Sequence, residues 1–377
     1  MFKKKVAHIY YNTSGNSGLY LNSIDNALCE EFEQKFFVNF YYPLQIENYI
    51  KIFFPLTEKN EHNLHIKILK SRYIRKILRY FELKKNNITL FYMLKKWNPD
   101  IINYSLTNMP DAYNVLKIIK IILPNVKILV TCHDVIPFQE TNNINYKAIY
   151  NYADYLIVHT QNAISILENT YKILANKILY HPFPLIDLSL LLNNHFIKKN
   201  KYYPSFLFIG VMRQEKGIQY LLDAWEILGP DFPAELVVAG FKPKEVSIDF
   251  SKLKSFKNFK ILEGSLSDEE YIKFIINTDY VIFPYIKVGN SGVLSTVISL
   301  NKVPLTTNLP TFIESQYCLN ELSCNPGDSQ ALASLIKQTI INHSEKYKVQ
   351  QKKIKLALEE YKKDFQVQVL QVYKKIM

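Results

Sequence analysis

The amino-acid sequence predicts an α/β protein with two domains, each built on a mostly parallel β-sheet. Short apolar segments alternate with helical patterns from Val6 to Tyr180, and a second alternating series begins at Phe206. Such alternation is typical of parallel strands in one sheet with helices on both of its faces. The 377 residues suffice for about two domains, and 48% hydrophobic against 21% charged residues describes a globular protein.

The first series is predicted to be regular from its start. Val6–Tyr11 indicates a strand, and a helix is expected from about Leu19 to Glu33. Further strands are expected at 36–40, 100–103, 127–131, 154–159 and 177–180, and helices at 112–123 and 160–171. The basic start before Val6 is followed by too short an apolar run for a signal peptide, and His8 interrupts it.

A connecting segment with three prolines, residues 181–204, separates the two series. We therefore expect one domain at 1–190 and a second at 191–350. Strands of the second domain are expected at 206–209, 235–239, 259–262, 280–283 and 303–306, with a helix at 328–341. Residues 351–377 continue a helix whose apolar positions form one stripe from Ile354 to Ile376, and this helix is expected to pack on the first domain.

The net charge of +12 predicts anionic partners, which include nucleic acid, acidic lipid surfaces and phosphorylated small molecules. No stacking or base-reading module is recognisable, so we expect no nucleic-acid partner. The four cysteines have neither CxxC nor metal-ligand spacing, which indicates reduced thiols in a cytoplasmic protein. Lysines and a proline interrupt the most apolar region, 116–130, so no stretch is expected to span a bilayer.

Much of the positive charge lies between residues 62 and 97. This segment holds ten Lys or Arg against one acid, Glu82, and its apolar residues keep helical spacing. A basic amphipathic helix can bind an anionic membrane interface, which would place the protein on the inner face of the cell membrane. The alternative is a domain helix with a solvated basic face. The cations named for a membrane or acceptor role are Lys67, Lys70, Arg72, Arg75, Lys76 and Arg79.

A strand-to-helix turn at Phe206–Gly217 has the chemistry of a phosphate site. Gly210 ends the apolar strand, Gly217 precedes a helical pattern, and Arg213 and Lys216 lie between them. Two cations beside the free amides of a helix N-terminus suit a phosphate. The alternative is a surface loop with two solvated cations.

Two features of the first domain also lie where strands end. Gly15 and Gly18 lie in a loop after the first strand. Such a loop can bring backbone amides close to a ligand, or it can be a tight turn that binds no ligand. His133 follows the strand at 127–131, and ligands of open α/β sheets bind at such carboxyl ends. A lone histidine at this place can equally be structural.

The second domain carries further motifs in a fixed order. After the turn come Val237–Pro243, Glu263–Glu270, Thr278–Tyr285 and Gly289–Leu294. With Gly-x-x-Arg-x-x-Lys-Gly at 210–217, this series resembles the donor domain of the GT-B glycosyltransferases of family 4. The first domain is similar more loosely, through Gly15–Gly18, Thr131–Asp134 and Ala153–Thr160.

The resemblance implies a GT-B fold: two Rossmann-like domains with parallel sheets facing a central cleft, and a C-terminal helix that crosses back to the first domain. It also implies a retaining hexosyl transfer from a nucleoside-diphosphate sugar to a glycan or lipid-linked acceptor, in bacterial surface polysaccharide or glycoconjugate synthesis. Neither a metal nor another cofactor is expected, and the chain has no Asp-x-Asp to carry a divalent ion.

The same resemblance assigns roles to residues. Arg213 and Lys216 would stabilise the leaving diphosphate, and His133 would approach the donor sugar. The remaining donor-binding candidates are Gly15, Asn16, Ser17, Gly18, Gly210, Gly240, Tyr285, Asn290, Ser291, Gly292, Val293, Leu294 and Thr296.

One family motif is not kept. The Glu-x7-Glu pair falls on Val288 and Thr296, and neither residue carries a charge. Thr296 would offer the donor ribose one hydrogen bond at best, where a carboxylate forms stronger, charge-assisted bonds. The donor is then held elsewhere, or the motif is shifted by a turn, or the chain is a non-catalytic subunit that supports a partner enzyme.

Overall fold

The computed structural model describes residues 3–11, 17–38, 49–51, 72–106, 111–136, 145–185, 203–315 and 317–377. The chain divides into unit 1, Met1–Phe183 with Phe365–Met377, and unit 2, Pro184–Asp364. The sequence placed these boundaries at 190/191 and 350/351. The difference at the second boundary arises because one helix, α12 (His343–Ile376), contributes residues to both units.

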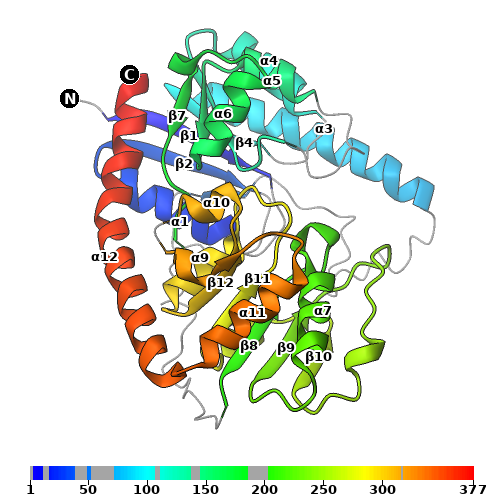
Figure 1. Ribbon diagram of the computed structural model, residues 1–377. Coiled ribbons are helices and arrows are strands. Elements are labelled where there is room, and N and C mark those ends of the chain that lie inside the picture. The colour runs from blue at the N-terminus through cyan, green and yellow to red at the C-terminus, as the bar shows by residue number, and fades with distance from the viewer. Residues whose placement is uncertain are drawn as a thin grey trace. The chain divides into compact units, whose positions relative to one another are not determined.

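Unit 1 contains a parallel sheet, with the described strands in the order β3-β2-β1-β4-β5-β6-β7 (Figure 1). The strands are β1 (Lys4–Tyr10), β2 (Phe32–Val38), β3 (Tyr49–Lys51), β4 (Ile101–Leu106), β5 (Lys127–Cys132), β6 (Tyr155–Val158) and β7 (Ile178–Tyr180). The helices are α1 (Ser17–Leu28), α3 (Arg72–Trp97), α4 (Ala112–Ile122), α5 (Tyr146–Tyr152) and α6 (Gln161–Asn169).

The segment from residue 19 to residue 40 differs from the prediction. The helix expected to reach Glu33 ends at Leu28, and strand β2 starts at Phe32, four residues before the expected strand. The cause is that burial in this segment repeats every two residues, as in a strand, and not every 3.6 residues, as in a helix. Phe32, Gln34 and Phe36 are buried, the residues between them are more exposed, and β2 pairs with β1.

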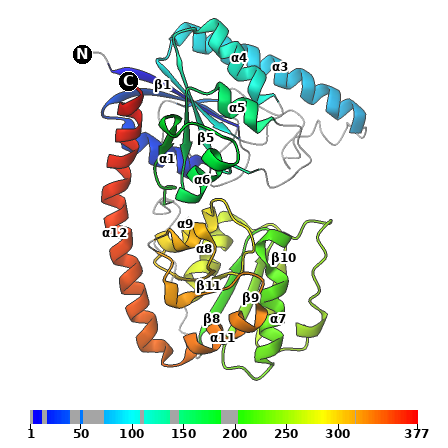
Figure 2. The same ribbon diagram turned by 45° about the horizontal axis from the view of Figure 1, so that its top comes forward.

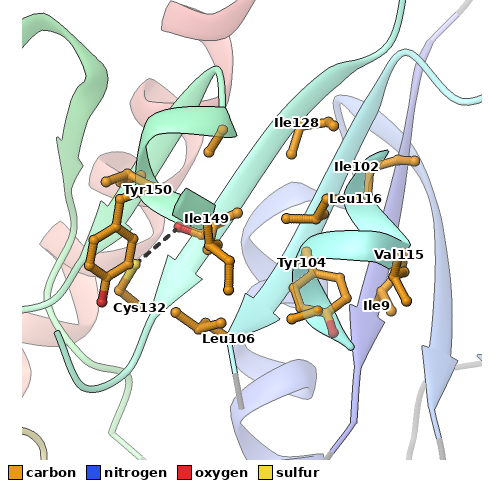
Figure 3. Packing of buried hydrophobic residues seen from close by; sticks show 14 of the residues in the cluster. Ile9, Ile102, Tyr104, Leu106, Val115, Leu116, Ile128, Cys132, Ile149 and Tyr150 are labelled. Carbon is orange, nitrogen blue, oxygen red and sulfur yellow. Dashed lines mark hydrogen bonds between the residues drawn. The ribbon is translucent and has the colours of Figure 1, made fainter. Parts of the chain in front are cut away.

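The main core of unit 1 lies between the sheet and the helices α3, α4, α5 and α6. Figure 3 shows the part of it beside α4 and α5. Ile9, Tyr104 and Ile128 come from neighbouring strands and pack with Leu116 of α4 and Tyr150 of α5. The end of α12 also belongs to unit 1, where Tyr373 is fully buried and its hydroxyl accepts a hydrogen bond from Asn103 Nδ2 at 2.8 Å.

Unit 2 contains a second parallel sheet, whose described strands are ordered β10-β9-β8-β11-β12-β13. They are β8 (Ser205–Ile209), β9 (Glu235–Gly240), β10 (Phe259–Glu263), β11 (Tyr280–Phe283), β12 (Val303–Thr307) and β13 (Ser323–Cys324). The helices are α7 (Ile218–Leu228), α8 (Asp268–Ile276), α9 (Gly292–Ser299), α10 (Pro310–Ile313) and α11 (Ser329–Ile340). Helices α7 and α11 pack together on one face, and α8 and α9 lie on the other (Figure 2). Both sheets confirm the predicted α/β class.

Candidate functional site

The strand order of unit 2 reverses between β8 and β11. The connection after β8 leads through α7 to β9, whereas the connection after β11 leads through α9 to β12 in the opposite direction along the sheet. Ligands of open α/β sheets bind outside the carboxyl ends of the strands at such a switch point. The β8–α7 loop with Arg213 and Lys216 therefore leaves the sheet at the place where the fold favours a ligand.

Three glycines let the backbones at this edge come close together. Gly210, Gly217 and Gly240 all have positive φ, at 125°, 62° and 139°. A Cβ on Gly240 would lie 1.9 Å from the Gly210 carbonyl oxygen, and one on Gly217 would lie 1.8 Å from the Pro284 carbonyl oxygen. Only glycine fits these two positions: Gly240 lets the ends of β8 and β9 approach each other, and Gly217 lets the loops after β8 and β11 touch.

Direct bonds also hold the β8–α7 and β11–α9 loops to each other. The Glu215 carbonyl oxygen accepts hydrogen bonds from the backbone N–H groups of Ile286 at 3.0 Å and Lys287 at 3.3 Å. The Lys216 ammonium lies 3.8 Å from the ring centroid of Tyr285. The position of the cation is thus fixed by the neighbouring loop, and this arrangement could not be read from the order of motifs.

The two predicted cations differ in their surroundings. Arg213 is 45% exposed and its guanidinium lies 3.7 Å from the Glu215 carboxylate, which offsets part of its charge. Lys216 is half-buried, and its ammonium is held against the face of an aromatic ring. Lys216 is therefore the stronger candidate for an anionic ligand.

Helix α9 begins beside Gly210, the residue that follows strand β8. The Ser291 side chain caps it by accepting a hydrogen bond from Leu294 N at 3.2 Å, and Val293 lies 3.6 Å from the position of a Cβ on Gly210. Gly292 starts the helix, and Asn290 precedes the cap and is half-buried. The partial positive charge of this N-terminus adds to the two cations at the same edge of the sheet.

The positions of the missing glutamates are also defined. Thr296 is fully buried, and its hydroxyl donates a hydrogen bond to the Gly292 carbonyl oxygen at 3.0 Å, so its proton is already used within α9. The Val288 carbonyl oxygen accepts a hydrogen bond from the Thr311 hydroxyl at 3.5 Å. Neither side chain supplies a charge, and the predicted hydrogen bond from Thr296 to the donor stays a prediction.

In unit 1, His133 belongs to a row of three histidines that the sequence did not reveal. His133, His159 and His181 each follow directly after the last residue of a strand, namely β5, β6 and β7. The ring centroids of His133 and His159 are 5.4 Å apart, and those of His159 and His181 are 4.8 Å apart. His159 Nδ1 donates to the His181 carbonyl oxygen at 3.1 Å, which fixes its tautomer.

The histidine row is enclosed by aromatic side chains. The rings of Tyr20 and Phe183 lie 4.9 Å and 6.1 Å from that of His133. Burial lowers the pKa of His133 and of His181 to about 4, and it lowers the pKa of His159 well below its ordinary value. All three imidazoles are neutral at pH 7, so His133 offers hydrogen bonds rather than a positive charge.

Several predicted residues lie outside this description. Gly15, Asn16, Lys67 and Lys70 are not among the described residues. Ser17 and Gly18 begin helix α1, and Arg72, Arg75, Lys76 and Arg79 lie in α3, but the positions of their side chains are not described. Their predicted roles in donor, membrane or acceptor binding stay predictions.

The close approach at Gly217 leads to a stability prediction. Gly217→Ala is expected to destabilise unit 2 by more than about 3 kcal/mol, because left-handed strain of about 1–3 kcal/mol adds to a backbone clash. Gly327→Ala is the control: Gly327 also has positive φ, 77°, but the nearest atom to its Cβ position is 3.6 Å away, an ordinary van der Waals distance. Urea unfolding of both variants checks this, and equal losses would contradict the clash.

Comparison with known proteins agrees with this geometry. Residues 203–342 match the family model of the group 1 glycosyl transferases. An uncharacterized glycosyltransferase of Methanocaldococcus jannaschii is 26% identical over 256 residues, which are 61% of this chain and 61% of that protein. The chain thus spans about three fifths of the length of this curated relative.

Solved structures with the same fold cover the whole chain. The catalytic domain of starch synthase IV from Arabidopsis thaliana, bound to ADP and acarbose, has a TM-score of 0.69 at 11% identity and covers 100% of both chains. The E. coli trehalose-6-phosphate structure bound with UDP-2-fluoro glucose has a TM-score of 0.65 at 10% identity, covering 97% of this chain and 99% of that one. At such identities these structures show the fold alone. The chain has the GT-B fold, and its residues 203–342 match the model of the group 1 glycosyl transferases.

Proposed function

We propose that this protein transfers a hexosyl group, with retention of configuration, from a nucleoside-diphosphate sugar to a glycan or lipid-linked glycan acceptor in bacterial surface polysaccharide or glycoconjugate synthesis. The observation that carries the proposal is the convergence of Lys216, Arg213 and the start of α9 at the switch point of unit 2. The ADP and UDP-2-fluoro glucose bound in two proteins of the same fold support the nucleoside-diphosphate class.

The chemistry of the site suits the departure of a diphosphate. As the bond between sugar and phosphate breaks, negative charge grows on the leaving oxygen, and the Lys216 ammonium and the α9 amides stabilise it. Because the Tyr285 ring holds the ammonium and the helix fixes its own amides, little reorganisation is needed when the charge develops. Neutral His133 is proposed to contact the donor sugar as a hydrogen-bonding group. No metal takes part in this proposal.

A panel of nucleotide-sugars tests the proposed function. Each sugar donor is added to the protein with and without EDTA, and the thermal unfolding midpoint is measured. A ligand at about 100 times its Kd should stabilise the protein by about 2.7 kcal/mol. Transfer to an acceptor from the same panel should continue in EDTA, and NMR of the product's anomeric proton tests retention. A requirement for added Mg²⁺ or Mn²⁺ would contradict the metal-independent mechanism.

A second candidate function follows from Val288 and Thr296. A buried Thr296 whose hydroxyl is used within its own helix cannot replace a ribose-binding carboxylate. This favours a glycosyltransferase-like subunit that supports a partner enzyme without binding a donor. The absence of any midpoint shift across the panel, with acceptor present, would favour this function over catalysis.

Helix α3 of unit 1 has features of a membrane-binding surface. Its buried side, with Leu90 and Leu94, packs in the core, whereas a second apolar row faces away and is 37–67% exposed. That row, the α3 stripe, is Ile74, Ile77, Leu78, Phe81, Ile88 and Tyr92. Exposed lysines lie within it or beside it, namely Lys84, Lys85, Lys95 and Lys96. No helix in the described ranges is both long and apolar enough to cross a bilayer. We therefore propose peripheral binding to an anionic membrane through the α3 stripe, at the cytoplasmic face.

Vesicle binding checks this proposal. The protein should sediment with vesicles containing phosphatidylglycerol, bind neutral phosphatidylcholine vesicles far less, and be released as salt is raised, because exposed charges are screened. Replacing both Ile77 and Phe81 with Glu should abolish sedimentation. Ile227→Glu is the matched control, since it places an acid at a 49% exposed isoleucine of unit 2. Equal binding to neutral and anionic vesicles would contradict the proposal.

A further inference from the structure

The ring of Tyr285 is held rigidly at the candidate site. It is 2% exposed and lies against two other aromatic rings, with centroid distances of 5.5 Å to Phe283 and 5.7 Å to Phe312. The backbone on which it sits is also fixed, because the Tyr285 carbonyl oxygen accepts a hydrogen bond from the Thr307 hydroxyl at 2.7 Å. A ring so buried is a poor candidate for direct contact with a donor, which was its predicted role.

The two ends of this ring reach the two cationic parts of the site. Its face lies 3.8 Å from the Lys216 ammonium, within the range of a cation–π interaction. Its hydroxyl lies beside the Ser291 side chain, the residue that caps helix α9, and burial raises the pKa of Tyr285 so that the phenol is neutral. One side chain thus links the cation of the β8–α7 loop to the start of α9.

We propose that Tyr285 is a positioning residue: its ring holds the Lys216 ammonium at the start of α9, where both act on the same diphosphate. This inference rests on the proposed function, since it assigns the way in which that site binds the phosphates. A lysine side chain has several rotatable bonds, and a fixed aromatic face limits the positions its ammonium adopts before the ligand arrives. Tyr285 itself does not touch the ligand.

The test varies the ring face while keeping its shape. Tyr285→Phe should retain binding of the best nucleoside diphosphate among UDP, ADP and GDP to within about threefold, because the face remains. Fluorinated phenylalanines at position 285 withdraw electrons from the face, so binding should weaken with each added fluorine. Tyr285→Leu should weaken binding about tenfold, roughly 1.4 kcal/mol. Tyr347→Leu is the control for losing a buried tyrosine ring elsewhere in unit 2.

A double-mutant cycle separates positioning from a general structural role. In a Lys216→Ala background, Tyr285→Leu should cause no further loss of nucleoside-diphosphate affinity, because the ammonium it positions is gone. Equal losses in both backgrounds, or fluorinated variants that bind like Tyr285→Phe, would overturn the inference while leaving the proposed function intact. A wild-type protein that binds none of the three diphosphates would instead contradict the proposed function, and the inference with it.

Discussion

Replacing Lys216 with alanine is expected to lower the transfer rate about 10²–10³-fold, equivalent to roughly 2.7–4 kcal/mol of transition-state stabilisation. The half-buried ammonium over the Tyr285 ring is the best placed of the described cations of unit 2 to meet a leaving diphosphate. Its loss removes a charge that matters most when the bond to the sugar breaks, so kcat should fall more than KM rises. Steady-state kinetics with the donor identified by the panel measure this.

Two further variants distinguish the role of Lys216 from a general effect of losing a positive charge. Arg213→Ala should cost less, because the guanidinium is 45% exposed and already 3.7 Å from the Glu215 carboxylate. Lys260→Ala removes an exposed cation of β10 that lies 3.9 Å from Glu235, so it controls for net charge alone. Transfer by Lys216→Ala near the wild-type rate would refute the role of this loop in catalysis.

Strand periodicity in the sequence predicted most of the sheet architecture. Buried strands such as Tyr280–Phe283 match their predicted bounds, because continuous apolar runs between turn residues leave little ambiguity. Strand β3 and helix α5 were not predicted, since a three-residue strand and a seven-residue helix carry too little pattern. The strand order was also beyond reach, because pairing depends on contacts between segments far apart in sequence.

The motifs did not reveal which contacts each of their residues makes. Asp279, part of the Asp-to-Tyr motif, lies at the amino end of β11, where its carboxylate accepts hydrogen bonds from Ser205 N at 3.0 Å and Ser205 Oγ at 2.9 Å. It joins two strands and is not part of the switch-point edge. The ring of Tyr285 likewise supports Lys216, a relation that only the three-dimensional contact reveals.

Acid is expected to unfold unit 1 selectively between pH 6.5 and about 4. Four of its histidines have lowered pKa values: His133 and His181 at about 4, His8 at about 3, and His159 well below its ordinary value. Burial is the main cause in each case, because it disfavours the charged imidazolium. In this pH range unfolded unit 1 therefore binds up to four more protons than folded unit 1.

Proton linkage gives the direction and the size of this change in the free energy of unfolding. The folded state favours the neutral histidines. Their contribution to the free energy of unfolding is therefore present in full above pH 6.5 and is lost as the pH falls toward 4. Each group lowers the free energy of unfolding by about 1.4 kcal/mol per pH unit, and four together by about 5 kcal/mol per pH unit. A domain with a typical stability of about 5–15 kcal/mol loses most of it within about two pH units.

The two tryptophans of the chain allow each unit to be followed separately. Trp97 lies in unit 1 and Trp225 in unit 2, so Trp225→Phe leaves a reporter of unit 1 and Trp97→Phe a reporter of unit 2. Urea unfolding at pH 7, 6 and 5 should show a steep loss of stability for unit 1 and a flatter one for unit 2.

A single substitution then isolates the histidine row. His159→Phe keeps an aromatic ring against Phe183, whose centroid lies 5.4 Å from that of His159, and removes one linked proton. The pH slope of unit 1 should fall by about 1.4 kcal/mol per pH unit. His343→Phe, a change in unit 2, should leave that slope unchanged. If His159→Phe also leaves the slope unchanged, His159 is not neutral in folded unit 1, because only a histidine that folds uncharged takes up its proton on unfolding.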